Sequence, residues 1–170
     1  VGGGLAGLCL AIQLADLKKS VILFEKNKYP FRKVCGEYIS HESKNFLISL
    51  GFAFDSFNLP EITQLGISSE QGFMVESPLD LGGFGVSRYF LDNELYRIAL
   101  SKSVTVVDDC KVQAVNSGKI SVVKASDMEF QAMIVCGTYG KYVPLFMQQY
   151  MEFKKLSQKK RANYIGVKYH

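Results

Sequence analysis

Apolar side chains recur at helical spacing in three stretches of the chain. Residues 5–18 place apolar positions three and four residues apart, which is typical of an amphipathic helix. Residues 42–50 show a shorter run of the same kind, and Gly51 predicts where that helix ends. Residues 92–102 return to helical spacing, and Asp92 is expected to be the N-cap because its side chain can accept a hydrogen bond from the first turn.

Short runs of β-branched and aromatic residues predict the strands. Residues 20–25 are an apolar run that ends in an acid, which is typical of a buried strand. Gly72 lies in a polar turn between the next two runs, and Ser117-Gly118 is a tight-turn signal, so each indicates a β-hairpin. The order of elements predicts a mixed α/β chain that begins with a parallel βαβ unit and adds an antiparallel meander. The later strand-like runs are 62–69, 73–77, 104–107, 111–116, 120–125 and 130–136.

The composition is that of an ordinary globular protein. The chain has 170 residues, of which 48% are hydrophobic and 21% charged, and this excludes a disordered or collagen-like chain. A net charge of +4 is a mild excess, and no nucleic-acid partner is expected, because such proteins usually concentrate their positive charge in a stripe. No apolar run approaches the roughly 18 residues of a membrane span, so no integral membrane segment is expected.

Four cysteines lie far apart, without a CxxC pair and with only two histidines in the chain. This spacing does not fit a zinc site, so no metal is expected. In the absence of a secretion signal, a disulfide framework is not expected either, and the cytoplasm is the expected compartment. The chain begins at Val1 without an initiator Met, in the middle of an expected strand, as a fragment would.

The opening residues VGGGLAGL carry the strongest signal in the chain. Gly2, Gly4 and Gly7 form the pattern GxGxxG between an expected strand end and an expected helix. The first glycine allows the tight turn, the second lets a pyrophosphate approach the backbone, and the third lets the helix pack closely on the sheet. The N–H groups at the helix N-terminus then form an anion site.

An acid stands at the position that this pattern requires. Glu25 follows Gly7 by eighteen residues, at the end of the second strand. A carboxylate there can accept hydrogen bonds from a ribose diol and would repel a 2′-phosphate. The sequence therefore predicts a dinucleotide site in preference to a purely structural glycine-rich turn.

Five motifs together resemble a superfamily of FAD-dependent oxidoreductases. These are the hydroxylase-like flavoproteins, which include geranylgeranyl reductases, aromatic-ring monooxygenases and flavin halogenases. The motifs are VGGGLAGL, LFEK, KVCGE, SRYFLD and IVCGTYGK, and the resemblance spans nearly all of residues 1–140. It implies a Rossmann-like FAD/NAD(P)-binding βαβ unit with an antiparallel meander and the start of a β-rich substrate domain. The FAD-binding domain would comprise 1–60 and 88–140, and the substrate domain would include 61–87 and 141–170.

The resemblance implies which residues hold the adenine half of FAD. Glu25 would bind the ribose of adenosine, and Lys26 would lie beside the adenine, which Val112 would contact through its backbone. The pyrophosphate would lie on the glycine turn and the first helical turn. The residues implied there are Gly2, Gly4, Leu5, Ala6 and Gly7.

Residues further along the chain would hold the flavin half. Arg32 would lie over the ribityl-phosphate region, Cys35 and Gly36 would lie near the isoalloxazine ring, and Arg88 would reach the cofactor from the start of a helix. Arginine suits a pyrophosphate because it donates paired hydrogen bonds. The alternatives are surface ion pairs for the two arginines and an inert, small apolar side chain for Cys35.

The motif after the last strand departs from the superfamily pattern. Many of its hydroxylases carry an Asp-Gly pair there, close to FAD and the reduced nicotinamide, and Tyr139 before Gly140 stands where the Asp would be. This departure favours the reductase-like branch over NADPH-driven hydroxylation. Members are also typically more than twice as long, so we expect the chain to be the front part of a larger flavoprotein.

The leading hypothesis is therefore an FAD-dependent oxidoreductase. It would be a reductase-like dehydrogenase that acts on a hydrophobic small molecule through hydride transfer at the flavin, with NAD(P)H as candidate reductant. Alternating apolar positions in 62–77 would suit a hydrophobic substrate such as a prenyl chain, although ordinary core packing is the favoured explanation of this pattern. The alternatives are a flavin monooxygenase or halogenase, a dinucleotide-binding module without turnover, and a purely structural α/β domain.

Overall fold

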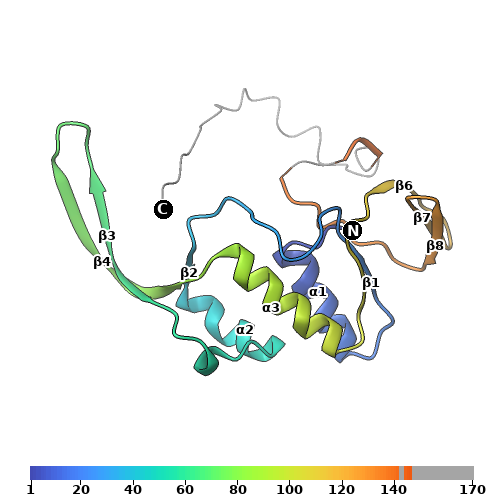
Figure 1. Ribbon diagram of the computed structural model, residues 1–170, viewed down its shortest axis with the longest axis horizontal. Coiled ribbons are helices and arrows are strands. Elements are labelled where there is room, and N and C mark those ends of the chain that lie inside the picture. The colour runs from blue at the N-terminus through green and yellow to red at the C-terminus, as the bar shows by residue number, and fades with distance from the viewer. Residues whose placement is uncertain (142–143, 147–170) are drawn as a thin grey trace.

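The computed structural model describes residues 1–141 and 144–146, and it confirms the predicted mixed α/β architecture (Figure 1). The helices are α1 (Leu5–Asp16), α2 (Lys44–Leu50) and α3 (Arg88–Ser101). The strands are β1 (Ile22–Phe24), β2 (Tyr38–Ser40), β3 (Glu61–Ser68), β4 (Met74–Gly85), β5 (Thr105–Val107), β6 (Val112–Asn116), β7 (Ser121–Ala125) and β8 (Met128–Ala132). Short 3-10 turns at His41–Ser43 and Phe54–Ser56 flank α2.

A parallel sheet connects the first residues of the chain to its distant parts. Strand β1 pairs with β5 in parallel. The ladder continues on the other side of β1, because Gly2 N donates to Phe24 O at 2.8 Å and Thr138 N donates to Val1 O at 2.8 Å. Residues 136–138 therefore lie beside the opening residues, which lie beside β1. This arrangement confirms the predicted parallel unit, with α1 as the crossover helix.

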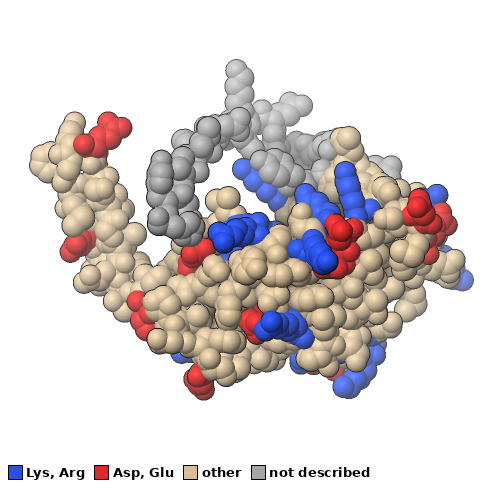
Figure 2. All heavy atoms as spheres, in the orientation of Figure 1, with Lys and Arg blue, Asp and Glu red and all other residues tan. Residues whose placement is uncertain are grey.

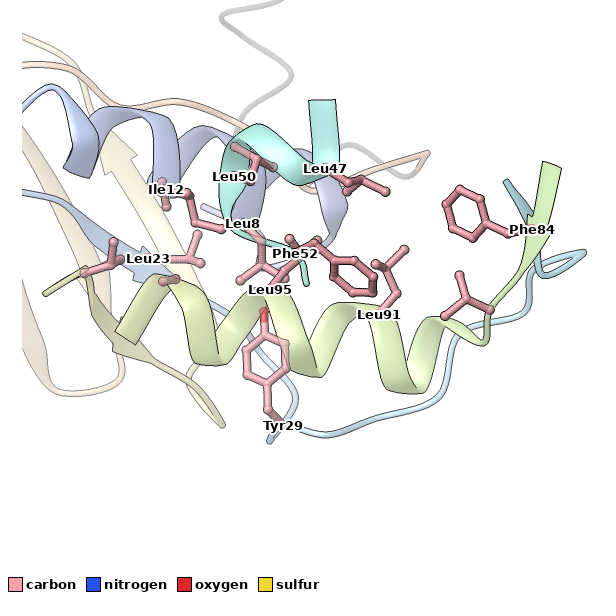
Figure 3. Close-up of a cluster of buried hydrophobic side chains, with 14 residues drawn as sticks. Leu8, Ile12, Leu23, Tyr29, Leu47, Leu50, Phe52, Phe84, Leu91 and Leu95 are labelled. Carbon is pink, nitrogen blue, oxygen red and sulfur yellow. The ribbon is translucent and has the colours of Figure 1, made fainter. Parts of the chain in front are cut away.

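Helices α1 and α3 pack against each other, and their apolar stripes meet in the main core (Figures 1 and 3). In Figure 3, Leu8 and Ile12 of α1, Leu50 of α2, and Leu91 and Leu95 of α3 converge in one cluster, and all five are fully buried. The apolar spacing that predicts these helices from the sequence is thus the spacing of the faces that the core buries.

The meander forms a separate antiparallel sheet in the order β6-β7-β8. A second apolar cluster joins this sheet to β1 through Phe24, whose ring meets that of Phe130 edge-on at 5.0 Å. The prediction of a last strand over 130–136 was wrong in its bounds, since β8 ends at Ala132. The chain then leaves β7, because the backbone around Cys136 pairs with Val1 instead.

The β3–β4 hairpin extends away from the body of the protein (Figure 1). Ile67 lies opposite Val75 in the register, which places both on one face together with Leu65 and Phe73. These four side chains are between 46% and 75% exposed. Core packing, the explanation favoured from the sequence, is therefore wrong for this face. Of the five apolar positions in the predicted pattern, only Ile62, at the base of the hairpin, is half-buried.

Helix α3 begins one turn earlier than the apolar spacing predicts. Ser87 is the N-cap, and its Oγ accepts a hydrogen bond from Phe90 N at 3.2 Å. The prediction that Asp92 caps this helix was wrong, since Asp92 lies inside it and pairs with Arg88. A serine cap followed by an ion pair four residues apart stabilises the additional turn.

The proposed division into two domains stays a prediction. Residues 61–87 contain the β3–β4 hairpin, whereas 141–170 fall almost entirely outside the described residues. Within the described residues, none of the helices has the length and apolar character that a membrane span requires.

Leu95 tests the main core. Leu95→Ala removes a fully buried side chain from the contact between α1 and α3, and we expect it to lower the free energy of unfolding by about 2–5 kcal/mol. Urea denaturation followed by circular dichroism measures this change. Leu100→Ala, on the same helix but 44% exposed, is the matched control and should stay within about 0.5 kcal/mol of the wild type. Equal losses for both variants would contradict this core.

Candidate functional site

The glycine turn before α1 is closed by contacts between backbone segments. Gly2 has a φ of +103°, and a Cβ on it would lie 2.5 Å from the carbonyl oxygen of Thr138. A Cβ on Gly7 would overlap the carbonyl oxygen of Gly2. The first and third glycines therefore perform the tasks predicted for them, a tight turn and a close approach of helix to strand. Thr138 Oγ1 also donates to Gly2 O at 2.7 Å, which ties the turn to a distant segment.

The second glycine of the motif faces two cationic side chains. A Cβ on Gly4 would have only two neighbours within 4 Å, namely Lys33 Nζ at 3.1 Å and Arg88 Nη2 at 3.9 Å. Gly4 is also the N-cap of α1, which has no side-chain cap and no acid in its first turn. The N–H groups at the start of α1 and two basic side chains thus border the same space, an arrangement suited to a bound anion. We call this space the Gly4 cradle.

Glu25 lies beside the turn and holds its backbone. It is buried, and its Oε2 accepts a hydrogen bond from Gly3 N at 2.8 Å. Its Oε1 accepts from Asn27 N at 3.0 Å and from Asn27 Nδ2 at 2.8 Å. A carboxylate has about four lone-pair sites, so three hydrogen bonds leave room for a further donor such as a ribose hydroxyl. The acid predicted to bind ribose therefore has a second task, which the sequence motif does not show.

Tyr29 holds the same turn from the other side. Its hydroxyl donates a hydrogen bond to Gly3 O, and its ring stacks on Tyr96 with the centroids 4.4 Å apart. Burial raises the pKa of the Tyr29 hydroxyl well above its usual range, and the nearby charge of Glu25 adds to that shift. The hydroxyl therefore stays protonated at neutral pH and remains a hydrogen-bond donor to Gly3 O.

Arg88 reaches the cradle from the first residue of α3. Its Nε donates to Asp92 Oδ1 at 2.7 Å and its Nη2 donates to Asp92 Oδ2 at 2.8 Å. The hydrogen bond to Asp92 is the main cause that raises the pKa of Arg88, and contact with the Cys35 thiol contributes further. The predicted site residues Arg88, Cys35 and Gly4 are therefore brought together in space.

The remaining predicted residues lie at varying distances from the cradle. Leu5 and Ala6 form the first turn of α1, and Gly36 is exposed with open space around it. Val112 is buried on β6, shortly after Cys110, whose N–H donates to Glu25 O at 2.9 Å.

Arg32 and Lys26 are both exposed, and Arg32 lies over the ring of Tyr89 at 5.8 Å. The cation beside Gly4 is Lys33, which sequence reasoning missed although it follows Arg32 in the same basic segment. Thr138 was also missed, since nothing local in the sequence marks it as a partner of the glycine turn. Asp92 was predicted to be an N-cap, whereas it forms an ion pair with Arg88. Its spacing of four residues from Arg88 was the signal for an ion pair.

The charges of the chain are divided between the body and the hairpin region. Residues 45–87 contain no Lys or Arg and five acids, whereas the other described residues contain 14 Lys and Arg against 10 acids, a net charge of +4. Figure 2 shows acidic but no basic side chains on the hairpin, whereas basic side chains gather on the body. This distribution favours the approach of an anionic nucleotide to the part of the protein that contains the cradle.

The comparisons with known proteins identify a Rossmann-like fold. The model of the NAD(P)-binding Rossmann-like domain family matches residues 1–53. No curated protein sequence matches the chain. Among solved structures, the flavin-dependent brominase Bmp2 is 23% identical with a TM-score of 0.61, and the match covers 76% of this chain and 34% of that protein.

Two other solved structures show the same relationship. Halogenase PltM, solved with phloroglucinol and FAD, is 19% identical with a TM-score of 0.63, covering 78% of this chain and 32% of PltM. A flavoprotein/dehydrogenase from Cytophaga hutchinsonii is 22% identical with a TM-score of 0.65, covering 78% of this chain and 36% of that protein. The chain thus spans about a third of the length of these proteins.

The fold and the comparisons define a class. The chain has a Rossmann-like fold that is also found in flavin-dependent halogenases and a flavoprotein/dehydrogenase. This confirms, at the level of the fold, the resemblance to the hydroxylase-like flavoprotein superfamily.

Gly7 tests the close approach of α1 to the opening residues. Gly7→Ala places a Cβ against Gly2 O, and we expect a loss of about 1–3 kcal/mol in the free energy of unfolding, because backbone on both sides must shift. Gly66→Ala is the matched control, since Gly66 has no atom within 4 Å of an added Cβ. Thermal and urea denaturation of both variants measure the difference. A Gly7→Ala protein as stable as the Gly66→Ala protein would contradict the geometry of the turn.

Proposed function

We propose that this chain binds FAD and belongs to an FAD-dependent oxidoreductase. The observation that carries the proposal is the Gly4 cradle, where open backbone at a helix N-terminus meets Lys33 and Arg88. A dinucleotide pyrophosphate carries two negative charges, and the two cations and the helix N-terminus are of the opposite sign. Glu25, at the end of β1, supports a ribose beside that pyrophosphate. The fold shared with flavin-dependent enzymes favours FAD over other dinucleotides.

The residues of the chain would divide the work of holding the cofactor. The cradle would bind the pyrophosphate, Glu25 the adenosine ribose, and the segment around Cys35 and Gly36 would lie on the flavin side. When bound, the flavin supplies hydride or oxygen chemistry, and the protein supplies orientation and electrostatics. The Arg88 guanidinium is charged throughout the physiological range, and the hydrogen bond to Asp92 raises its pKa further.

The reaction that we propose first is hydride transfer by a reductase-like dehydrogenase, with NAD(P)H as the reductant. Tyr139 stands where superfamily hydroxylases carry Asp, and one structural relative is described as a flavoprotein/dehydrogenase. The exposed apolar face of the hairpin, which includes Ile67 and Phe73, supports a hydrophobic small-molecule substrate.

A flavin-dependent halogenase is the second candidate. The observation in its favour is that several of the similar solved structures are halogenases, among them Bmp2, PltM and CmlS. The two candidates share the cofactor site and differ in what reacts with the reduced flavin. A functional assay therefore has to establish cofactor binding first and reaction type second.

A titration of the purified chain with FAD, with NAD and ATP as comparators, tests the proposal. A ligand that binds only the folded state raises stability by about 2.7 kcal/mol at a hundredfold excess over its dissociation constant. We expect a rise in melting temperature with FAD alone, and anaerobic bleaching of the bound flavin by NADH or NADPH. A rise with NAD alone would favour a dehydrogenase or sensor of NAD, and no rise with any ligand would contradict the proposal. Bound FAD that neither nicotinamide reduces would favour a module without turnover.

Lys33 tests the composition of the cradle. Lys33→Gln removes one of the two cations beside Gly4, and we expect the affinity for FAD to fall about tenfold, because a charge-assisted contact to phosphate is lost. The loss should shrink as the salt concentration rises. Lys119→Gln, at an exposed position in the turn between β6 and β7, controls for the change in net charge. Quenching of flavin fluorescence measures both affinities, and equal affinities of the two variants would contradict a contribution of Lys33 to FAD binding.

A further inference from the structure

Asp92 is a buried acid next to a site that we propose binds an anion. Its side chain is 2% exposed, and it lies inside α3, four residues after Arg88. A carboxylate at this depth without a partner would strongly destabilise the fold, so Asp92 requires a partner. Arg88 is that partner, and the two parallel hydrogen bonds of 2.7 and 2.8 Å satisfy both carboxylate oxygens.

The pair fixes the plane of the Arg88 guanidinium relative to the Gly4 cradle. Arg88 Nη2 donates to Asp92 Oδ2. The same atom lies 3.9 Å from the position that a Cβ on Gly4 would take. A guanidinium has five N–H donors in a rigid fork, and Asp92 engages two of its nitrogens through one N–H each. The remaining N–H groups of Nη1 and Nη2 are then held in one orientation at the edge of the cradle.

We propose that Asp92 is a positioning residue for phosphate recognition, acting only through Arg88. The inference rests on the proposed function, because it assumes that the cradle holds the pyrophosphate of a dinucleotide. Asp92 aims the free edge of Arg88 at the anion and limits the loss of side-chain entropy on binding. Without Asp92, the long Arg88 side chain would turn toward solvent, since it is already partly exposed.

Two physical effects of Asp92 oppose each other, and this makes the inference testable. The carboxylate repels a nearby phosphate by Coulomb interaction, so its removal alone would tighten the binding of an anion. Its positioning of Arg88 favours the anion, so removal would weaken binding. The sign of the change in affinity therefore decides between a positioning role and a purely electrostatic one.

The experiment is a double-mutant cycle on the full chain with FAD as the probe. The four proteins are the wild type, Asp92→Asn, Arg88→Met, and the double variant. We expect Asp92→Asn to weaken FAD binding about tenfold, Arg88→Met to weaken it at least as much, and the double variant to bind no more weakly than Arg88→Met. Flavin fluorescence quenching gives the affinities, and circular dichroism establishes that each variant is folded.

Each other outcome has a definite meaning. Equal or tighter binding by Asp92→Asn would overturn the inference, and so would a loss that persists undiminished in the Arg88→Met background, since that indicates a general structural role. Failure of the wild type to bind FAD would overturn the proposed function instead, so the two failures are distinct. If Asp92→Asn does not fold, Asp92→Glu replaces it. We expect that variant to bind several-fold more weakly because the longer side chain displaces the guanidinium, and unchanged affinity would overturn the inference.

Discussion

Helix α1 lies so close to the backbone that precedes it that no Cβ fits between Gly7 and the carbonyl of Gly2. The rest of the site depends on this approach. It directs the first N–H groups of α1 toward the Gly4 cradle, and it leaves Gly2 O available to Thr138. The same turn therefore places the backbone beside the Gly4 cradle and ties the segment around Thr138 to the central sheet.

Buried polar groups hold this arrangement in one conformation. Glu25 accepts from Gly3 N, Tyr29 donates to Gly3 O, and Asp92 accepts from Arg88. Among the described residues, no buried side-chain oxygen or nitrogen lacks a hydrogen-bond partner. A satisfied network of this kind is stiff, because turning any one group would leave another buried without its partner. The backbone of the glycine turn and the guanidinium of Arg88 are accordingly held in one arrangement.

The division of charge gives the protein two unlike regions. The body that contains the cradle is basic, whereas the hairpin region is acidic and exposes an apolar face. A basic body attracts a nucleotide, and an acidic, apolar extension does not compete for it. The glycine turn lies within residues 1–53, which the model of the NAD(P)-binding Rossmann-like domain family matches, and it belongs to the basic body.

The sequence by itself determined the elements whose signals are local. Apolar spacing predicted α1 and α2, the glycine pattern predicted the tight turn before α1, and turn residues predicted both hairpins. The prediction failed at the start of α3, where Ser87 rather than Asp92 is the N-cap. Asp92 lies inside the helix and pairs with Arg88.

Only the tertiary structure decided which distant groups meet. It placed Lys33 rather than Arg32 beside Gly4, brought Thr138 to the glycine turn, and left the hairpin face uncovered by other described elements. The physical reason is that a periodic pattern specifies which face of an element is apolar or polar. Which other segment contacts that face depends on how the chain closes its loops and packs its core.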